Sequence, residues 1–154
     1  MDTKNRFHTA QTWLWVRAEH LTLVVVLVVL LAVHLGEVNW LRFVVAFAAL
    51  DIIGYIPGAF AYRRAGGGRI TPFYHHLYNL THSYLTAGVV AGVWALTLGG
   101  FEWAMLALPI HLSGDRGLFG NTYKPTALPF EPAAAPGAGS GSRLSQGVPH
   151  DVHA

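Results

Sequence analysis

The chain has 154 residues, of which 53% are hydrophobic and only 12% are charged, and its formal net charge is +2. Soluble domains are usually about 25% charged, so this composition favours a single membrane domain over a water-soluble globule. The absence of cysteine excludes disulfides and thiolate-based sites, and the few basic residues, scattered beside apolar runs, do not support nucleic-acid binding.

Four apolar segments predict membrane-spanning helices, each of which needs about 20 residues. The first covers residues 21–35, "LTLVVVLVVLLAVHL", and is lengthened by the upstream "TWLWV"; it is too long for a signal peptide, and we expect it to be retained. The second covers residues 38–60. The third runs from about residue 74 to residue 98, and the fourth begins at Phe101 and reaches past His111. We therefore expect an all-α, four-span transmembrane bundle.

The positions of the basic residues predict the orientation of this bundle. Lys and Arg precede the first span, lie between the second and third, and follow the fourth, at positions 4, 6, 17, 63, 64, 69, 116, 124 and 143. The other two connections, "GEVN" and "GGFE", contain no basic residue. Basic loops face the cytoplasm. We therefore expect both termini in the cytoplasm and a multi-pass protein of the plasma (inner) membrane, with the lipid bilayer as its partner.

The composition changes after residue 124. The remainder is rich in Pro, Ala, Gly and Ser, and such a segment buries too little apolar surface to fold alone. The predicted organisation is a four-helix transmembrane domain, residues 1–124, and a flexible cytoplasmic tail, residues 125–154. In the third span, Gly88, Ala91 and Gly92 would permit close helix contact, either inside the bundle or in a homo-oligomer.

Four of the ionisable residues in the predicted spans are candidate ligands, and such groups are costly in a membrane and usually face the bundle interior. Asp51 is placed nearer the cytoplasmic end of the second span, because Pro57 marks that end. His82 lies about two turns into the third span. His111 and Asp115 lie on the last turns of the fourth. Three different helices thus bring candidate ligands to a similar depth.

Residues three and four apart share a helix face. His111 and Asp115 form one such face, and Tyr78, Asn79 and His82 form another. Bundles use His and carboxylate pairs at this spacing to project metal ligands inward. A mixed nitrogen and oxygen set suits a divalent ion, which lowers the pKa of bound water and so generates a nucleophile. The predicted metal ligands are Asp51, His82, His111 and Asp115.

Structural interpretations compete with this hypothesis. His34 has no companion at helical spacing and is expected to be a hydrogen-bonded core residue. His75 and His76 flank the cytoplasmic interface and are expected to be solvated. Arg116 could close a salt bridge with Asp51 or Asp115, which would make the cluster a structural link between helices. The functional and structural interpretations of the cluster weigh about equally.

Three blocks of sequence, "LDIIGY", "YNLTH" and "HLSGDRGLFGNTYK", resemble the signature blocks of a small bacterial four-helix membrane family of unknown activity, domain of unknown function 4260. The resemblance covers about residues 40–124 and implies candidate positions but no reaction. These are Asp51, Gly54, Tyr55, Tyr78, Asn79, His82, His111, Asp115, Arg116 and Lys124. The family has a tight Gly-x-Gly-Leu-Lys stretch where this chain spaces Gly117 and Gly120 more widely, so a role for Lys124 is in doubt.

The triplet at residues 81–83 and the His111 to Asp115 block are also loosely similar to membrane-bound metal-dependent hydrolases. That similarity favours a hydrolase but implies no substrate. Together with the expected convergence of the four ligands, it leads to the hypothesis of a metal-dependent hydrolase that acts on a lipid-linked or amphipathic substrate. Arg116 would then join the four metal ligands in the catalytic site and pair with an anionic group of the substrate, while Tyr78 and Asn79 would orient the substrate. The alternative is a non-enzymatic structural, binding or small transport protein of the membrane.

Overall fold

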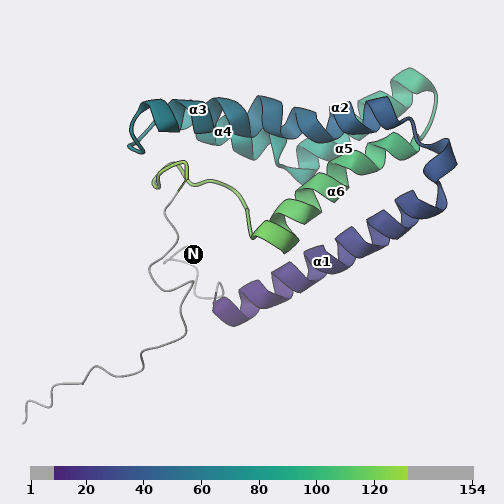
Figure 1. Cartoon of the computed structure of the whole chain (residues 1–154), viewed down its shortest axis with the longest axis horizontal. Helices are drawn as coiled ribbons and strands as arrows, with labels where there is room; N and C mark the ends of the chain where they lie inside the picture. The colour runs from purple at the N-terminus through teal and green to yellow at the C-terminus, as the bar shows by residue number, and fades with distance from the viewer. Residues whose placement is uncertain (1–8, 132–154) are drawn as a thin grey trace, which may run out of the picture.

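The computed structural model describes residues 9–131, and this part of the chain is helical, without a strand, which confirms the predicted all-α class. The helices are α1 (Ala10–Val33), α2 (Trp40–Leu50), α3 (Ile56–Arg64), α4 (Pro72–Thr81), α5 (Tyr84–Leu98) and α6 (Ala107–Gly114) (Figure 1). A π-helical turn, Asp51–Tyr55, joins α2 to α3, and a second one, Asp115–Phe119, follows α6. Short 3-10 turns lie at Leu35–Glu37 and Trp103–Leu106.

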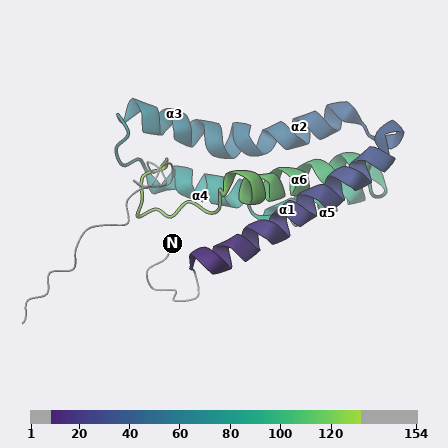
Figure 2. The same ribbon diagram turned by 60° about the horizontal axis from the view of Figure 1, so that its bottom comes forward.

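The helices pack side by side along one long direction (Figures 1 and 2). The run of α2 and α3 lies beside α4 and α5, and α1 packs against α6. The α1–α2 and α5–α6 connections lie at one end of the molecule, whereas the α3–α4 loop and the segment after α6 lie at the other (Figure 1). The basic loop of residues 63–69 is therefore at the opposite end from residues 34–39.

Local sequence signals explain where several helices begin and end. Thr9 caps α1 in a capping box with Thr12, and the Asn39 side chain caps α2. The Ser83 hydroxyl accepts a hydrogen bond from the first turn of α5. Gly99, with φ of 77°, ends α5 in the left-handed conformation that glycine adopts without strain.

Two helical runs, Ala10–Val33 and Trp40–Arg64, are long and apolar enough to cross a membrane, with mean hydropathies of 2.2 and 1.9. Within α1, only Leu27 is buried by other parts of the chain. The remaining apolar side chains of α1 point away from the bundle or lie only partly covered. A helix that is apolar on all sides and so little buried is unsuited to a water-facing surface.

The prediction of one continuous third span over residues 74–98 is wrong. Helix α4 ends at Thr81, and α5 begins at Tyr84 and has 15 residues, fewer than a span needs. The break follows from Ser83, which caps α5 in an extended conformation instead of continuing α4. The fourth predicted span is a run of 3-10, α and π pieces from Trp103 to Phe119. Of the four predicted spans, two thus have the required length.

The second run extends further than the sequence predicted, and this changes the depth of Asp51. The helix does not end at Phe60 but continues through Pro57 to Arg64. Proline lacks the N–H that an α-helix interior uses, and the π-helical turn immediately before it accommodates this loss. Asp51 therefore lies near the middle of the 25-residue run, not nearer its end.

The predicted boundary of the tail also differs from the structure. Residues 125–131 pack against the bundle, and the Phe130 side chain is 0% exposed, in a cluster with Ala59 and Tyr78. A Cβ at Gly58 would overlap the Phe130 ring, so glycine is required for this contact. The rest of the predicted tail, residues 132–154, lies outside the described residues.

Candidate metal centre

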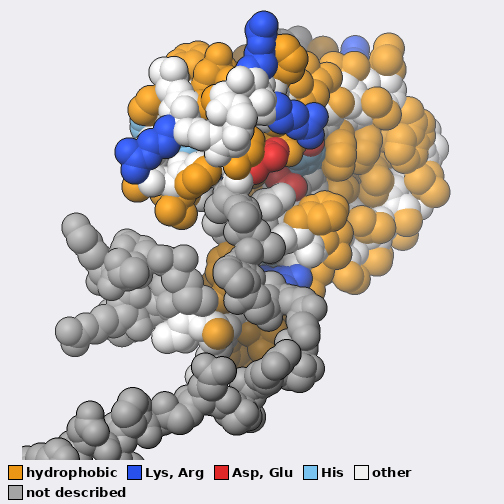
Figure 3. Space-filling view, turned by 60° about the vertical axis from the view of Figure 1, so that its left-hand side comes forward, with side chains coloured by type: hydrophobic (Ala, Val, Ile, Leu, Met, Phe, Trp, Pro, Cys, Tyr) orange, Lys and Arg blue, Asp and Glu red, His pale blue; other side chains and the backbone are white. Residues whose placement is uncertain are grey.

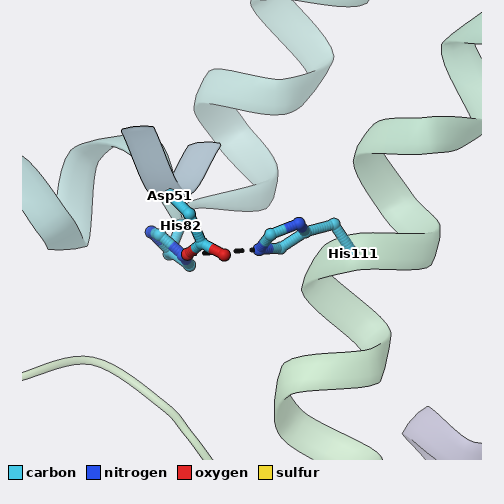
Figure 4. A group of neighbouring side chains, drawn as sticks. All are labelled: Asp51, His82 and His111. Atoms are coloured by element: carbon cyan, nitrogen blue, oxygen red, sulfur yellow. Dashed lines mark ion pairs between the residues drawn. The ribbon is translucent and has the colours of Figure 1, made fainter. Parts of the chain in front are cut away.

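Three of the four predicted ligands, Asp51, His82 and His111, meet at one point, and Asp115 lies beside the two histidines. Asp51 begins the π-helical turn after α2, and His82 caps the C-terminal end of α4. His111 lies in α6, and Asp115 begins the π-helical turn that follows it. Figure 4 shows Asp51, His82 and His111 pointing toward one another from separate elements. One ligand atom from each of these three lies within 4.8 Å of the other two.

Nitrogen and oxygen atoms alternate around this point. His82 Nε2 is 3.4 Å from Asp51 Oδ1 and 3.5 Å from Asp115 Oδ2. His111 Nε2 is 3.6 Å and 3.7 Å from the same two oxygens. Ligand atoms about 2.1 Å from a tetrahedral ion such as zinc lie about 3.4 Å apart. The four nitrogen–oxygen separations are therefore close to those of a metal coordination sphere.

The hydrogen bonds of His82 direct one nitrogen toward the centre. Its Nδ1 lies 3.1 Å from the backbone oxygen of Tyr78 and 2.9 Å from the Thr81 hydroxyl. An Nδ1–H that donates to the carbonyl leaves the lone pair on Nε2, which is how protein partners orient metal-binding histidines. Among the described residues, Nε2 of His82 and Nε2 of His111 are buried without a hydrogen-bond partner. Buried polar atoms are normally satisfied. Nδ1 of His75 and Nδ1 of His111 also lack a partner within the described residues, so the two Nε2 atoms are distinguished by the carboxylate oxygens 3.4 to 3.7 Å from them.

Aromatic packing holds both imidazole rings. The Tyr78 ring stacks on the His82 ring with centroids 3.9 Å apart and an interplanar angle of 14°. The Phe47 ring lies 4.6 Å from the His111 ring. Fixed rings lose little conformational freedom when they bind a ligand, so the site is preorganised. The sequence analysis missed Phe47, although it lies four residues before Asp51 on the same helix face.

Gly54 allows the second helical run to approach the end of α4 closely. A Cβ at this position would overlap the Thr81 hydroxyl and lie 3.2 Å from His82 Nδ1. The same turn carries Asp51, so this contact brings the carboxylate to the histidine. Gly54 was singled out only through the family resemblance, and the structure supplies its physical reason.

The centre is buried on its histidine side and open on its carboxylate side. The side chains of His82 and His111 are 5% and 4% exposed, whereas that of Asp51 is 47% exposed. Figure 3, viewed from the end that carries the α3–α4 loop, shows acidic side chains in a recess beside basic side chains. Catalytic metal sites keep an open position for water or substrate, and this asymmetry suits one.

Arg116 has a structural role that the sequence did not predict. Its Nη2 donates a 3.0 Å hydrogen bond to the backbone oxygen of His82, and its guanidinium lies 4.4 Å from the Tyr84 ring centre. It thus binds a carbonyl at the C-terminal end of α4, where cations are favourable. Within residues 9–131 no ion pair joins Arg116 to Asp51 or Asp115, so the structural alternative does not rest on that salt bridge.

The Asn79 side chain is hydrogen-bonded to the Lys124 backbone and, unlike Tyr78, is not seen in contact with a candidate metal ligand. Its side-chain nitrogen donates to the Lys124 oxygen at 3.0 Å, and its side-chain oxygen accepts from the Lys124 backbone N–H at 2.7 Å. The amide is occupied by the backbone of the segment after α6. Its predicted contact with substrate would require these two bonds to be given up.

Lys124 and Tyr55 are two further positions of the resemblance. Lys124 belongs to the 121–131 segment, and Tyr55 contacts that segment from the turn after α2. Lys124 Nζ donates to the Phe130 oxygen at 2.7 Å and lies 4.9 Å from the Tyr78 ring centre. Burial lowers the pKa of Lys124 from its ordinary value. The Tyr55 hydroxyl donates to the Glu131 carboxylate. Neither residue is among the side chains that meet at the metal centre.

The remaining histidine predictions have mixed outcomes. His76 is exposed, as predicted, but the prediction that His75 is solvated is wrong, because it is only 2% exposed and packs against Phe130. The 121–131 segment covers it, and its Nε2 lies 3.2 Å from the Leu128 oxygen. His34 is hydrogen-bonded, as expected, although to Glu37 at 2.9 Å in a partly exposed position and not in the core.

Comparison of the chain with known proteins is negative at each level. No family model, curated protein or solved structure matches it. The two resemblances seen in the sequence, and the catalytic and substrate-binding roles that they imply, therefore remain predictions.

Proposed function

We propose that this protein is a multi-pass membrane protein whose Asp51, His82, His111 and Asp115 side chains hold a divalent metal ion for hydrolysis of an amphipathic or lipid-like substrate. The observation that carries the proposal is the alternation of nitrogen and oxygen ligand atoms at 3.4 to 3.7 Å, with both Nε2 atoms otherwise unpartnered. Nitrogen and carboxylate ligands in this number are those of hydrolytic zinc and related ions.

The location in a membrane is supported by two long apolar runs and by the distribution of charge. The basic loop of residues 63–69, which carries three arginines, and the described segment after α6, which carries Arg116 and Lys124, lie at the same end of the molecule (Figure 1). The positive-inside rule assigns that end to the cytoplasm. The α4–α5 pair and the run that ends at Phe119 would complete the bundle as the third and fourth spans, interrupted where they line the site, since irregular backbone is tolerated inside protein.

In this proposal, one set of residues binds the ion and Arg116 contacts the substrate. The two histidines and two carboxylates bind the ion, and the exposed side of Asp51 leaves room for water and substrate. A divalent ion at this position supplies a bound water of lowered pKa. Arg116, one guanidinium nitrogen of which bonds to His82, has further N–H groups that would stabilise a negatively charged substrate group.

A structural role for the cluster is the second candidate, and one observation favours it. The same four nitrogen–oxygen contacts are short enough to be ion pairs, provided that the histidines are protonated. The cluster could then link three helices without a metal. Paired charges between spans stabilise a bundle without any turnover. The two candidates differ in whether the purified protein contains a metal.

Metal analysis of the purified protein separates them. We expect about one equivalent of a divalent ion in the unaltered protein and a strong loss in both His82→Ala and His111→Ala. His34→Ala, at the other end of the molecule, is the matched control and should retain the ion. Hydrolysis of amphipathic ester and phosphate probes should disappear with chelation and return with the metal. Equal metal content in all four proteins would contradict the proposal.

A further inference from the structure

An apolar groove of about 500 Å³ lies between α2 and α5. Arg42 and Trp94 line one end of it, Thr81 lines the other, and Ala46, Ala49 and Ile53 lie between them. The small side chains of Ala46 and Ala49, three residues apart on one face of α2, leave the space open. Gly88 and Gly92 of α5 do not line this groove, and within the described chain nothing lies within 4 Å of a Cβ at either, so they make no close contact inside the bundle.

One end of the groove carries charge and the rest does not. Arg42 Nη1 lies 3.1 Å from both carboxylate oxygens of Glu102, and Trp94 Nε1 donates to the same carboxylate at 2.9 Å. The Arg42 side chain is nevertheless 48% exposed. A guanidinium has five N–H donors, so Arg42 keeps donors for a second anion at the mouth of the groove.

The length of the groove indicates what kind of group could fill it. The groove follows α2 and the π-helical turn after it from Arg42 to Ile53, about 16 Å at a rise of 1.5 Å per residue. That length matches one leaflet of the hydrocarbon core, which is about 30 Å thick in total. A helix is about 10 Å across with its side chains, whereas an extended hydrocarbon chain is much narrower. A single hydrocarbon chain is the apolar group that fits.

We propose that this groove binds an acyl chain of an anionic phospholipid, with the lipid phosphate at Arg42 and the chain running toward Thr81. A lipid in the leaflet on the Arg42 side has this orientation, because its head group lies at the interface and its chain ends near the middle of the bilayer. Trp94 and Arg42 are both residue types that interact with head groups at this depth. The proposal rests on the membrane location proposed above but not on the metal centre.

Quenching of Trp94 fluorescence by brominated acyl chains tests it. Protein that retains Trp94 alone, with its other tryptophans changed to Phe, is reconstituted into phosphatidylcholine vesicles that contain a small fraction of brominated phosphatidylglycerol or brominated phosphatidylcholine. We expect half-maximal quenching at about fivefold less phosphatidylglycerol, the preference that one arginine near the interface supplies. Arg42→Gln should remove the preference, and Arg42→Lys should keep most of it.

A matched pair of α2 variants tests the position of the chain. Ala49→Phe fills the groove and should reduce quenching by both lipids. Val44→Phe adds the same ring to the same helix at a side chain that is 59% exposed and does not line the groove, and it should leave quenching unchanged. Equal quenching by the two lipids with no effect of Ala49→Phe would overturn the proposal.

Other outcomes are equally decisive. Trp94 protected from both lipids would mean that a neighbouring protein covers the groove. Protein that does not float with the vesicles would overturn the membrane location and this proposal together. A protein that binds lipid as expected but contains no metal would contradict the proposed function while leaving the lipid site intact.

Discussion

Asp51 and Asp115 each begin a π-helical turn, and His82 lies where α4 breaks before α5. Three of the four candidate ligands therefore sit at irregular points of the backbone. π-Helical turns widen a helix locally and recur at functional sites. In this protein the two π-helical turns carry Asp51 and Asp115 and shift the direction in which these side chains leave the helix. In a regular helix, the 3.6-residue period would fix that direction.

Gly54 provides the sharpest prediction at the residue scale. Gly54→Ala would force its methyl group into the Thr81 hydroxyl and toward His82. We expect a loss of about 1–3 kcal/mol in the free energy of unfolding, typical of overpacking, and weaker metal binding because Asp51 moves away from the histidine. Denaturant titration and competition with a chelator measure the two effects.

Gly92→Ala is the matched control, because nothing lies within 4 Å of its Cβ position in α5. It should be neutral or stabilise the helix by about 0.5–1 kcal/mol, the ordinary preference for alanine over glycine. If Gly54→Ala behaves like Gly92→Ala in both measurements, the close approach of the two helices does not control the site.

At the scale of elements, the segment from residue 121 to residue 131 fastens one end of the bundle. Its backbone is held by Asn79, His75 and Tyr62, and its Phe130 ring is fully buried. Lys124 and Phe130 both contact the face or edge of Tyr78, which stacks on His82. The segment thus supports the ring that packs on a candidate metal ligand, although it supplies no candidate ligand itself.

Phe130→Ala should release this segment. Removal of a buried phenylalanine ring costs about 3–5 kcal/mol, and the segment has few other apolar contacts to replace it. We expect a lower unfolding midpoint and new protease cleavage between residues 121 and 131. Phe119→Ala, whose side chain is 74% exposed, should change neither. Cleavage that is identical in the two variants would show that Phe130 does not anchor the segment.

At the scale of the whole molecule, the arrangement of the helices predicts which loops face which side of the membrane. The chain has no cysteine, so single cysteines can be introduced and labelled without background. Gly36→Cys and Ala65→Cys lie at opposite ends of the molecule and in exposed positions. A membrane-impermeant maleimide should label Gly36→Cys from outside intact cells and Ala65→Cys only from the cytoplasmic side.

Leu96→Cys serves as the control for burial in lipid. Its side chain is 85% exposed from the protein, so in water it would react readily, whereas in hydrocarbon it should not react from either side. Rapid labelling of Leu96→Cys, or labelling of both loop cysteines from one side, would contradict the proposed four-span topology.

The all-α class followed from the sequence by itself, because apolar period and charge depletion are local properties. The sequence also predicted four spans, of which two have the required length within the described residues, and four candidate ligands, of which Asp51, His82 and His111 form one close group. It also explains the break at Ser83 in hindsight, since Ser is a preferred N-cap, but the apolar run through residues 74–98 concealed that signal.

Only the tertiary structure decided the rest. His75 is buried because the 121–131 segment, which is distant in sequence, packs over it through Phe130. The Asn79 side chain bonds to the Lys124 backbone of the same segment, because buried backbone groups need hydrogen-bond partners. Asp51 and His82 meet because Gly54 lacks a side chain that would keep two helices apart. Contacts between distant segments depend on shape at the point of contact, and no local pattern in the chain encodes that shape.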